Sequence, residues 1–366
     1  MTLEELRDHM SLLGEKPFRA AQVYRAIHVE GRLDPQAMTN LPIVLRDRLA
    51  DSAAPATSVL EAQTSHDGTT KFLLALSDGT RVETVLIPDN KRKTVCVSAQ
   101  VGCPIGCIFC ASGVGGVVRN LTTAEMVEQV LRVRAHIDQR PSNIVVMGMG
   151  EPMLNLPALA RAIRLWTDPH GMGFSPRRIT VSTAGVPAKI DQLAEMDLGV
   201  NLAVSLHASD DETRTALVPG SPVGRTRGLV DAAARYARKT GRDATVEYVL
   251  IGGINDRLEH AGTLANLVQG RHIHVNLIPL NPVSHRPDLR APSQTVCRAF
   301  AGRLEDMGTS VTLRSTRGDD IAAACGQLAL ERAVGGKSLN PDAATQEASS
   351  PGTAPTETLP SRTDPK

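Results

Sequence analysis

Three cysteines stand in one short segment of the chain, where Cys103, Cys107 and Cys110 are spaced C-x3-C-x2-C. Cysteine thiolates at such spacing are the usual ligands of iron–sulfur clusters. Three ligands for a cluster of four irons leave one iron open to bind a cofactor. Gly102 and Gly106 suit a loop that turns sharply around metal. The spacing therefore predicts a [4Fe–4S] cluster with one reactive iron.

A structural zinc site, completed by Cys96 or by a distant histidine, is the alternative interpretation of these thiols. Structural zinc sites usually combine two C-x2-C pairs or nearby histidines, and neither pattern is present here. The remaining cysteines, Cys297 and Cys325, lie far downstream. Six cysteines in 366 residues are too sparse for a secreted disulfide scaffold, and the N-terminus carries no apolar export signal. We therefore expect metal and redox chemistry in the cytoplasm.

The elements that position these thiols are short buried strands alternating with amphipathic helices. The apolar pattern predicts strands at 94–99, 143–147, 178–182, 201–206, 245–250, 274–278 and 311–314. It predicts helices at 122–137, 156–166, 187–196, 226–240, 256–269 and 293–307. Such repeats indicate an α/β fold with a parallel sheet, built as a partial (β/α) barrel. A doubly wound sheet is the alternative. In barrels of this kind, functional groups follow the carboxyl ends of the strands.

Four regions are expected along the chain. Residues 1–62 form a helical accessory domain, and residues 63–91 a β-hairpin extension whose tight turn includes Asp78-Gly79. Residues 92–334 form the barrel. Residues 335–366 are rich in Pro, Ser, Thr and Gly, and we expect them to be disordered.

The composition argues against some functions. Forty basic and 39 acidic side chains give a formal net charge of +1, so no strong basic excess points to a nucleic acid. Five Phe, three Tyr and one Trp are too few for a base-stacking platform. No apolar run approaches the roughly 18 to 20 residues of a membrane span, so no membrane association is expected.

The cysteine motif after the first barrel strand resembles that of the radical S-adenosylmethionine superfamily. Residues 147–152, which read MGMGEP and follow the second strand, resemble the superfamily's second motif. This resemblance implies that the open iron binds the amino and carboxylate groups of S-adenosylmethionine. Reduction of the cluster then cleaves the cofactor to a 5′-deoxyadenosyl radical. It also implies that Gly150 and Glu151 contact the cofactor's ammonium group.

A closer resemblance covers the chain from its first helices to Leu328. The chain is similar to the dual-specificity RNA methyltransferases, RlmN and its relative Cfr, which methylate adenine carbons. The segments that carry the similarity are FRA at 18–20, MTNLP at 38–42, RVETV at 81–85, CVSAQVGC at 96–103, VSTAG at 181–185, SLHA at 205–208, NLIPLNP at 276–282 and TRGDDIAAACGQL at 316–328. Each stretch is weak by itself, but together and in this order they are specific.

The family resemblance implies a two-stage reaction at C2 of adenine, an electron-poor carbon that does not attack a sulfonium methyl group. Cys325 first takes a methyl group from one cofactor molecule. A radical from a second cofactor molecule then activates that methyl group, which adds to the ring. Cys96 releases the product through a transient disulfide with Cys325, and Glu83 acts as the base. The non-catalytic alternatives are that Cys96 is a buried apolar side chain, that Glu83 is a solvated surface charge and that Cys297 is structural.

Cofactor contacts are expected where strands end at the barrel mouth. Ser182, Ser205 and Asn281 carry hydroxyl or amide groups that reach a ribose or carboxylate, and Leu206 and His207 belong to the same region. His207 is equally consistent with a core histidine. We expect Ile108 and Phe109 to pack against the cofactor's adenine.

The implied substrates are 23S rRNA and tRNA, in the latter at the purine next to the anticodon. The basic runs 91–93 and 177–178 are candidate phosphate contacts, although such short runs are more often ordinary surface. An electron donor such as flavodoxin or ferredoxin and a thiol reductant are needed, and we expect a monomer.

The alternatives are a Cfr-type C8 methyltransferase of 23S rRNA, a glycyl-radical activase and a zinc-stabilised RNA-binding protein. Ile27-His28, where many members carry Trp, and the loop 218–223 depart from the family pattern.

Overall fold

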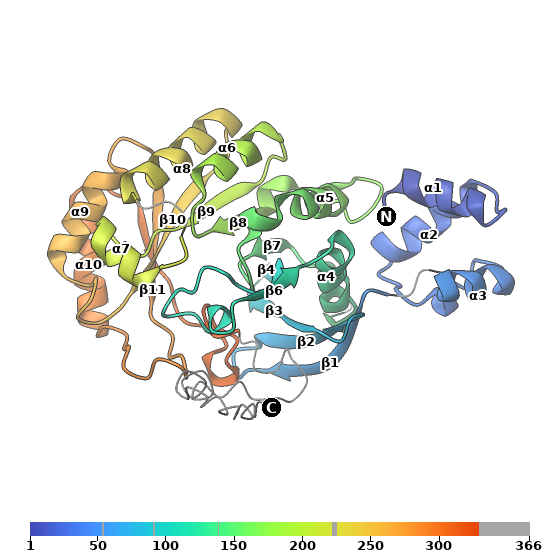
Figure 1. Cartoon of the computed structure of the whole chain (residues 1–366), viewed down its shortest axis with the longest axis horizontal. Coiled ribbons are helices and arrows are strands. Elements are labelled where there is room, and N and C mark those ends of the chain that lie inside the picture. The colour runs from blue at the N-terminus through green and yellow to red at the C-terminus, as the bar shows by residue number, and fades with distance from the viewer. Residues whose placement is uncertain (53–54, 91, 138, 222–224, 329–366) are drawn as a thin grey trace, which may run out of the picture.

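The computed structural model describes residues 1–52, 55–90, 92–137, 139–221 and 225–328. One ten-stranded sheet organises these residues, in the order β1-β2-β3-β4-β7-β8-β9-β10-β11-β12 (Figure 1). Its strands are β1 (Thr57–Thr64), β2 (Thr70–Leu76), β3 (Arg81–Asp89), β4 (Arg92–Cys96), β7 (Asn143–Val146), β8 (Ile179–Thr183), β9 (Asn201–Ser205), β10 (Ala244–Leu250), β11 (His274–Pro279) and β12 (Val311–Leu313).

The strands from β4 to β12 pair in parallel, whereas β1 to β4 pair antiparallel. Each new strand of the parallel part is added beside the previous one, and the order never reverses within the described residues. A doubly wound sheet requires a reversal of strand order, so that alternative is wrong. The predicted α/β fold with a partial (β/α) barrel is confirmed, and no strand pairing closes the barrel among the described residues.

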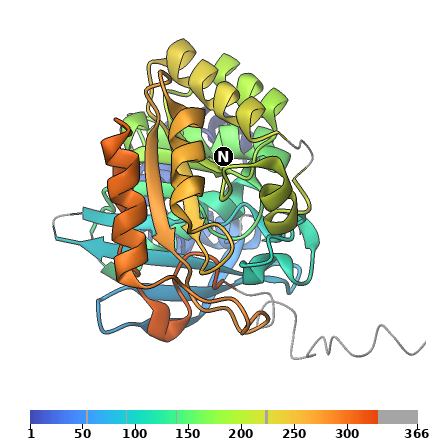
Figure 2. The ribbon, with the colours of Figure 1, turned by 90° about the vertical axis from the view of Figure 1, so that its left-hand side faces the viewer.

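Helices cover the outer face of this sheet because right-handed crossovers between sequential parallel strands all fall on one side. These helices are α4 (Thr123–Ile137), α5 (Leu156–Thr167), α6 (Pro187–Glu195), α8 (Thr226–Thr240), α9 (Leu258–Val268) and α10 (Gln294–Asp306). Figure 2 shows α9 and α10 side by side against the last strands. The inner face of the sheet is thereby left to loops and to the residues of the site.

The N-terminal helices α1 (Leu3–Leu12), α2 (Phe18–His28) and α3 (Ile43–Ser52) lie at one end of the molecule (Figure 1). The Tyr24 hydroxyl donates a hydrogen bond to Asp168, just after α5. The guanidinium of Arg134, on α4, donates to the carbonyl oxygen of His28 at 3.2 Å. These bonds join the helical region to the outer helices rather than to the inner face of the sheet.

Four elements differ from the sequence prediction. The helical reading of residues up to about 60 is wrong at its end, because β1 begins at Thr57 and pairs with β2. A short hairpin of β5 (Gln100–Gly102) and β6 (Val117–Asn120) frames the cysteine loop, and the helix α7 (Asp211–Leu217) follows β9. All of these elements are short, and periodicity does not distinguish short elements well. The expected disordered tail at 335–366 lies outside the described residues.

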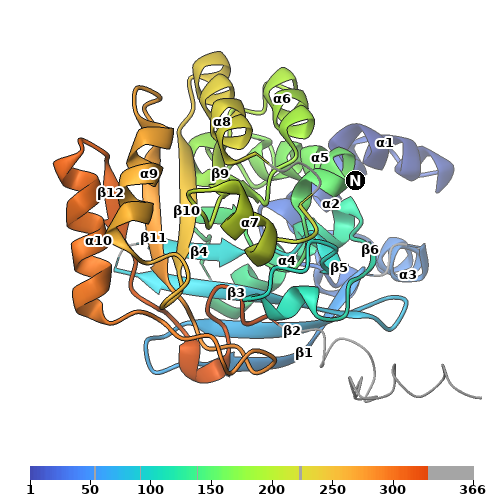
Figure 3. The same cartoon turned by 60° about the vertical axis from the view of Figure 1, so that its left-hand side comes forward.

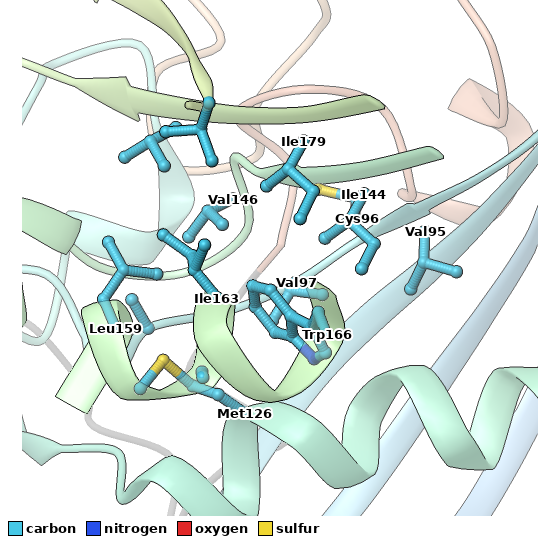
Figure 4. Close-up of a cluster of buried hydrophobic side chains, with 14 of the residues drawn as sticks. Val95, Cys96, Val97, Met126, Ile144, Val146, Leu159, Ile163, Trp166 and Ile179 are labelled. Atoms are coloured by element: carbon cyan, nitrogen blue, oxygen red, sulfur yellow. The ribbon is translucent and has the colours of Figure 1, made fainter. Parts of the chain in front are cut away.

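The main core lies between the sheet and the outer helices. Figure 4 shows Trp166 of α5 packed with Met126 of α4 and with Val97 and Ile163, and all four side chains are fully buried. Cys297, at 2% exposure, belongs to the same core, as its structural interpretation expects. Among the described residues, no helix is long and apolar enough to span a membrane.

Candidate active site

The site lies at the carboxyl ends of the parallel strands, where the loops after β4, β7, β8, β9 and β11 meet. A C-terminal loop, residues 314–328, follows β12 and includes the 3-10 turn η5 (Asp319–Ile321). We call it the Cys325 loop. Figure 3 shows it in red, returning across the inner face of the sheet to β2 and β3. Segments distant in sequence are thus brought to one place.

The cysteine loop is held in a tight conformation by its glycines and by backbone hydrogen bonds. Gly106 has φ +62°, and a Cβ atom on Gly113 would lie 2.8 Å from the Gly106 Cα atom. The amide of Cys103 donates to the carbonyl of Gly116, and the amide of Ile108 donates to that of Leu217. The loop is therefore packed closely against β6 and α7, and its three thiols occupy one partly buried surface.

Burial disfavours the thiolate form of these cysteines. It raises the pKa of Cys103 to about 12, and it raises the pKa values of Cys107 and Cys110 as well. The neighbouring thiols add to the increase at Cys107. Three thiols that repel one another as anions suit a cationic metal cluster, because metal binding removes their protons.

The arrangement fits a cluster better than a single ion. Among the described residues, no three His, Cys, Asp or Glu side chains converge closely enough to hold one metal ion. A cluster binds each thiolate at a different iron, so its ligands need not meet at one point. Cys103, Cys107 and Cys110 thus fit a [4Fe–4S] cluster.

A buried cation lies beside the cysteine loop. Arg214 of α7 is 2% exposed, and its guanidinium donates hydrogen bonds to the carbonyl oxygens of Ala184, Ser205 and Leu206. Burial lowers the pKa of Arg214 to about 10, while the thiol of Cys107 acts in the opposite direction. Arg214 therefore ties the ends of β8 and β9 together and places a positive charge near the thiols.

Gly150 and Glu151 follow β7 and are held against β5. Gly150 has φ +99°, and a Cβ atom there would lie 2.5 Å from Cβ of Gln100. The Glu151 carboxylate accepts hydrogen bonds from the amides of Met153 at 2.9 Å and Ala184 at 2.6 Å. Burial nevertheless raises the pKa of Glu151. The Thr183 side chain also bonds to this carboxylate, and the remaining acceptor capacity suits another donor, such as an ammonium group.

The ends of β8 and β9 bring together the other predicted cofactor contacts. The hydroxyl oxygens of Ser182 and Ser205 are 3.4 Å apart and half-buried. Leu206 is fully buried, and His207 follows it with φ +59°. These residues lie on the same edge of the sheet as Glu151.

His207 has a defined orientation and charge. Its Nδ1 accepts a hydrogen bond from the amide of Val249, so the ring proton lies on Nε2. The ring packs edge-on against Phe109, with centroids 4.9 Å apart. Burial lowers the pKa of His207 to about 3, and Arg214 contributes to the decrease. The imidazole is therefore a neutral donor beside the cysteine loop.

Asn281, at the end of β11, contacts the Cys325 loop. Its side-chain amide donates to the carbonyl oxygen of Cys325 at 2.9 Å, and its oxygen accepts from the Thr316 hydroxyl at 3.0 Å. Ala111, beside the last cluster cysteine, donates from its amide to the carbonyl of Gly326 at 2.7 Å. These bonds fix Cys325 between β11 and the cysteine loop.

The thiol of Cys325 affects the pKa of Cys96. Cys96 ends β4 and is 8% exposed, among core side chains that include Ile144 (Figure 4). Burial raises the pKa of Cys96 to about 12, and the Cys325 thiol contributes. Cys325 is exposed as a residue, and desolvation of its thiol raises its pKa to about 11. Cys110 contributes to that increase, which places Cys325 near the cysteine loop as well.

Glu83 is buried on the same face of the sheet as Cys96. It lies on β3, is 2% exposed, and its carboxylate forms an ion pair with the Nζ atom of Lys71 at 3.3 Å. Glu83 is therefore not the solvated hairpin charge of the alternative interpretation. Lys71 also donates to the carbonyl oxygen of Ala322 in the Cys325 loop at 3.2 Å.

The predicted basic runs do not join this group. Arg177 and Arg178 precede β8, and Arg92 and Lys93 begin β4, so both runs lie at the amino ends of the strands. Arg92 pairs with Asp89, and Lys93 donates to Gln139. The carboxyl ends of the strands, where the site lies, are at the opposite edge of the sheet. Lys91 lies outside the described residues.

Lys71 and Arg214 are the site residues that sequence reasoning missed. Lys71 begins the apolar run Phe72–Leu76 and shares the face of Leu73, and a lone cation at such a position was a usable signal. Arg214 follows an acidic helix start at Asp211 and Glu212 and reads as a surface charge in the sequence.

Comparisons with known proteins agree with this geometry. A family model described as the radical SAM superfamily matches residues 97–265, and one described as the N-terminal domain of the ribosomal RNA large subunit methyltransferase matches residues 1–54. The probable dual-specificity RNA methyltransferase RlmN of Rhodopirellula baltica is 46% identical over 335 residues, covering 90% of both chains. That of Thermus thermophilus is 44% identical and covers 86% of this chain and 89% of its own.

A solved structure is also similar. The radical SAM methyltransferase from Sphaerobacter thermophilus has a TM-score of 0.86 and 43% identity, over 90% of this chain and 98% of its own. Membership of the radical SAM superfamily assigns a [4Fe–4S] cluster and S-adenosylmethionine to the site. On these similarities, which extend through both matched domains, the chain belongs to the RlmN family of radical SAM RNA methyltransferases.

Proposed function

We propose that this enzyme methylates C2 of adenine in 23S rRNA and in tRNA, there at the purine next to the anticodon, with Cys325 as the methyl carrier. The observation that carries the proposal is the position of Cys325. The Ala111–Gly326 hydrogen bond, the effect of the Cys325 thiol on the pKa of Cys96 and the effect of Cys110 on the pKa of Cys325 support a position between the cysteine loop and Cys96. A carrier thiol must reach the cofactor on one side and a second thiol on the other.

In the first stage, the Cys325 thiolate attacks the methyl group of S-adenosylmethionine. A sulfur–carbon bond forms on Cys325, the sulfonium–methyl bond breaks, and S-adenosylhomocysteine leaves. Because the pKa of Cys325 is raised to about 11, only a small fraction is thiolate at neutral pH.

In the second stage, a cluster held by Cys103, Cys107 and Cys110, with a second molecule of S-adenosylmethionine and an electron from a flavodoxin or ferredoxin, would supply a 5′-deoxyadenosyl radical able to remove one hydrogen atom from the Cys325 methyl group. The methylene carbon on Cys325 then bonds to C2 of the adenine. Glu83 accepts the proton that leaves C2. Two cofactor molecules are consumed in each turnover.

Cys96 completes the reaction. Its sulfur bonds to the sulfur of Cys325 while the bond between that sulfur and the methylene carbon breaks, and the carbon takes up a proton to become the product methyl group. From the methylene radical onward, one proton and one electron are released. The electron would return to the cluster held by Cys103, Cys107 and Cys110, which balances the one taken up in cofactor cleavage, so the second stage consumes no net electron. Formation of the disulfide oxidises the two thiols by two electrons in total, so a cellular thiol must reduce it before the next turnover.

The remaining predicted residues suit cofactor binding. Glu151 has acceptor capacity for an ammonium group, and the hydroxyl groups of Ser182 and Ser205 lie side by side. The Nε2 proton of His207 is a neutral donor at the same edge. The side-chain amide of Asn281 is hydrogen-bonded within the Cys325 loop. It contacts the cofactor directly only if it releases these partners, and otherwise affects the cofactor through the position of the loop. We further propose a cytoplasmic monomer.

A Cfr-type enzyme, acting at C8, is the second candidate, because the same thiols and carboxylate serve either carbon. The discriminating experiment is mass spectrometry of nucleosides from ribosomal and transfer RNA of a deletion strain. Loss of 2-methyladenosine from both RNAs supports the proposal. Unchanged 2-methyladenosine with loss of 8-methyladenosine contradicts it and favours the second candidate.

A further inference from the structure

The ammonium group of Lys71 joins two parts of the site that the reaction must use together. Its Nζ atom lies 3.3 Å from Oε1 of Glu83 and 3.2 Å from the carbonyl oxygen of Ala322. Glu83 lies on β3, and Ala322 belongs to the Cys325 loop. Lys71 itself comes from β2, so three separate segments meet at one nitrogen atom.

This arrangement is buried. The side chains of Lys71 and Glu83 are 8% and 3% exposed. An unpaired buried charge is costly, and a buried carboxylate without a cation tends to take up a proton. An opposite charge at this distance favours the ionised form instead. Lys71 therefore supplies the condition under which a buried Glu83 can act as a base.

The sheet register explains why the two side chains meet. Leu73 pairs with Glu83 and Lys71 pairs with Val85, so Lys71 and Glu83 are diagonal neighbours on one face. The opposite face of β2 carries Phe72, which packs against His136 of α4. The Lys71–Glu83 face is thus the inner one, toward the Cys325 loop.

Ala322, whose carbonyl oxygen bonds to Lys71, has an unfavourable backbone conformation. It has φ +50°, in the left-handed region that a residue with a side chain seldom adopts. Ala323 donates from its amide to the carbonyl of Gly318, which closes the turn before Cys325. A bond from Lys71 to the Ala322 carbonyl therefore stabilises the turn that presents Cys325.

We propose that Lys71 is a positioning residue for methyl transfer to RNA, which keeps Glu83 ionised and fixes its distance from the Cys325 loop. The inference rests on the proposed role of Glu83 as the base. Lys71 touches no reacting atom and acts through Glu83 and Ala322. When Glu83 has accepted the proton from adenine, the attraction to Lys71 weakens, and this favours return of the proton to solvent or product.

Other charged groups lie around Glu83. Arg81 lies two residues before it on β3, on the same face, and Glu61 of β1 is opposite Leu73. Cys96 of β4 and Cys325 have pKa values raised to about 12 and 11, so they do not titrate in acid. Glu128 and His136 of α4 belong to the opposite face, where Glu128 accepts from Thr57.

The test separates the two stages of the reaction over a range of pH. Enzyme already methylated on Cys325 is mixed with RNA under single-turnover conditions, and the rate of RNA methylation is measured for Lys71→Gln, Lys71→Arg and Glu83→Gln. Lys71→Gln keeps a donor for the Ala322 carbonyl but lacks the charge, whereas Lys71→Arg keeps the charge. Lys189→Gln, on the exposed surface of α6, is the matched control.

For Lys71→Gln, we expect the acidic limb of the rate profile to move to higher pH by about 1 to 3 units, the usual effect of losing an adjacent opposite charge. The fraction of Cys325 that becomes methylated should change less than twofold. Lys71→Arg should keep the limb near its original position. Infrared difference spectra should show the protonated carboxyl band of Glu83 appearing at correspondingly higher pH.

If Lys71→Gln alone does not fold, a double variant provides the test. Lys71→Gln/Glu83→Gln replaces the ion pair by two neutral side chains, and Lys71→Gln should have no further effect in that background. An unmoved limb in Lys71→Gln, or a further loss in the double variant, overturns the role of Lys71. If Glu83→Gln alone keeps a normal rate and profile, then Glu83 is not the base, and the proposed mechanism fails together with the inference.

Discussion

The side-chain amide of Asn281 donates a 2.9 Å hydrogen bond to the carbonyl oxygen of Cys325. Asn281 lies two residues after the end of strand β11, whereas Cys325 lies on the loop that follows β12. Together with the Ala111–Gly326 and Lys71–Ala322 bonds, it fixes the Cys325 loop at three points around the site. The rigid strands thereby position a thiol that belongs to no regular element.

Replacement of Asn281 by Leu should loosen the Cys325 loop, because the Cys325 carbonyl loses its donor and the Thr316 hydroxyl loses its acceptor. We expect faster hydrogen exchange in residues 316–328 and a rate of Cys325 methylation lower by about tenfold, corresponding to roughly 1.4 kcal/mol. Asn201→Leu is the control, since Asn201 donates to the Arg177 carbonyl at the other edge of the sheet. Equal exchange in both variants would show that Asn281 does not hold the loop.

Replacement of Cys96 by Ala should stop the reaction after the new carbon–carbon bond has formed. Without the second thiol, the sulfur–carbon bond to Cys325 cannot be exchanged for a disulfide, so protein should remain attached to RNA. Denaturing gels with labelled RNA measure the adduct. Cys297→Ala, in the core of α10, should give none. Free methylated RNA from Cys96→Ala, without adduct, is the opposing result.

Replacement of Arg214 by Met should destabilise the protein. Three backbone carbonyl oxygens, those of Ala184, Ser205 and Leu206, would lose a buried donor. At about 1 to 3 kcal/mol for each unsatisfied group, we expect the free energy of unfolding to fall by at least about 3 kcal/mol. Arg235→Met, which removes an exposed pair with Asp191, should cost about 1 kcal/mol or less. Urea unfolding measures both, and similar losses would contradict this reading.

His207 should make folding stability depend on pH below neutrality. Burial lowers its pKa from the usual 6.5 to about 3 in the folded protein, so the unfolded chain binds more protons between these values. Its contribution is therefore fully present above about pH 6.5 and is lost as the pH falls toward 3. In His207→Gln, the difference in stability between pH 7 and pH 4 should be smaller than in the parent protein. His272→Gln, at an exposed position, should leave that difference unchanged.

The sheet was predictable because its strands are strongly apolar and alternate with long amphipathic helices. The seven predicted barrel strands all occur, with bounds that differ by a few residues, and β10 (Ala244–Leu250) is a typical case. The edge strand β1 was missed, since its residues are mostly exposed and follow a helical pattern. The seven-residue helix α7 is too short for periodicity to reveal.

The sequence proposes the cluster cysteines through local spacing, and Cys96, Cys325 and Glu83 through similarity of whole segments. The partners that position them were not predictable. Lys71 lies 251 residues from Ala322, and Arg214 lies 30 residues from Ala184, so only the folded sheet brings these groups together. The bond from Asn281 to the Cys325 carbonyl is equally invisible in the sequence, because a backbone acceptor leaves no residue type to recognise.

The central claim is that the methyl group passes through Cys325 before it reaches C2 of adenine. The most direct measurement uses S-adenosylmethionine with a fully deuterated methyl group, followed by mass spectrometry of the nucleosides from the product RNA. Transfer through a methylene on Cys325 predicts 2-methyladenosine with two deuterium atoms in its methyl group and the third in 5′-deoxyadenosine. A product methyl group that keeps all three deuterium atoms, or deuterated product from Cys325→Ala, would contradict the account.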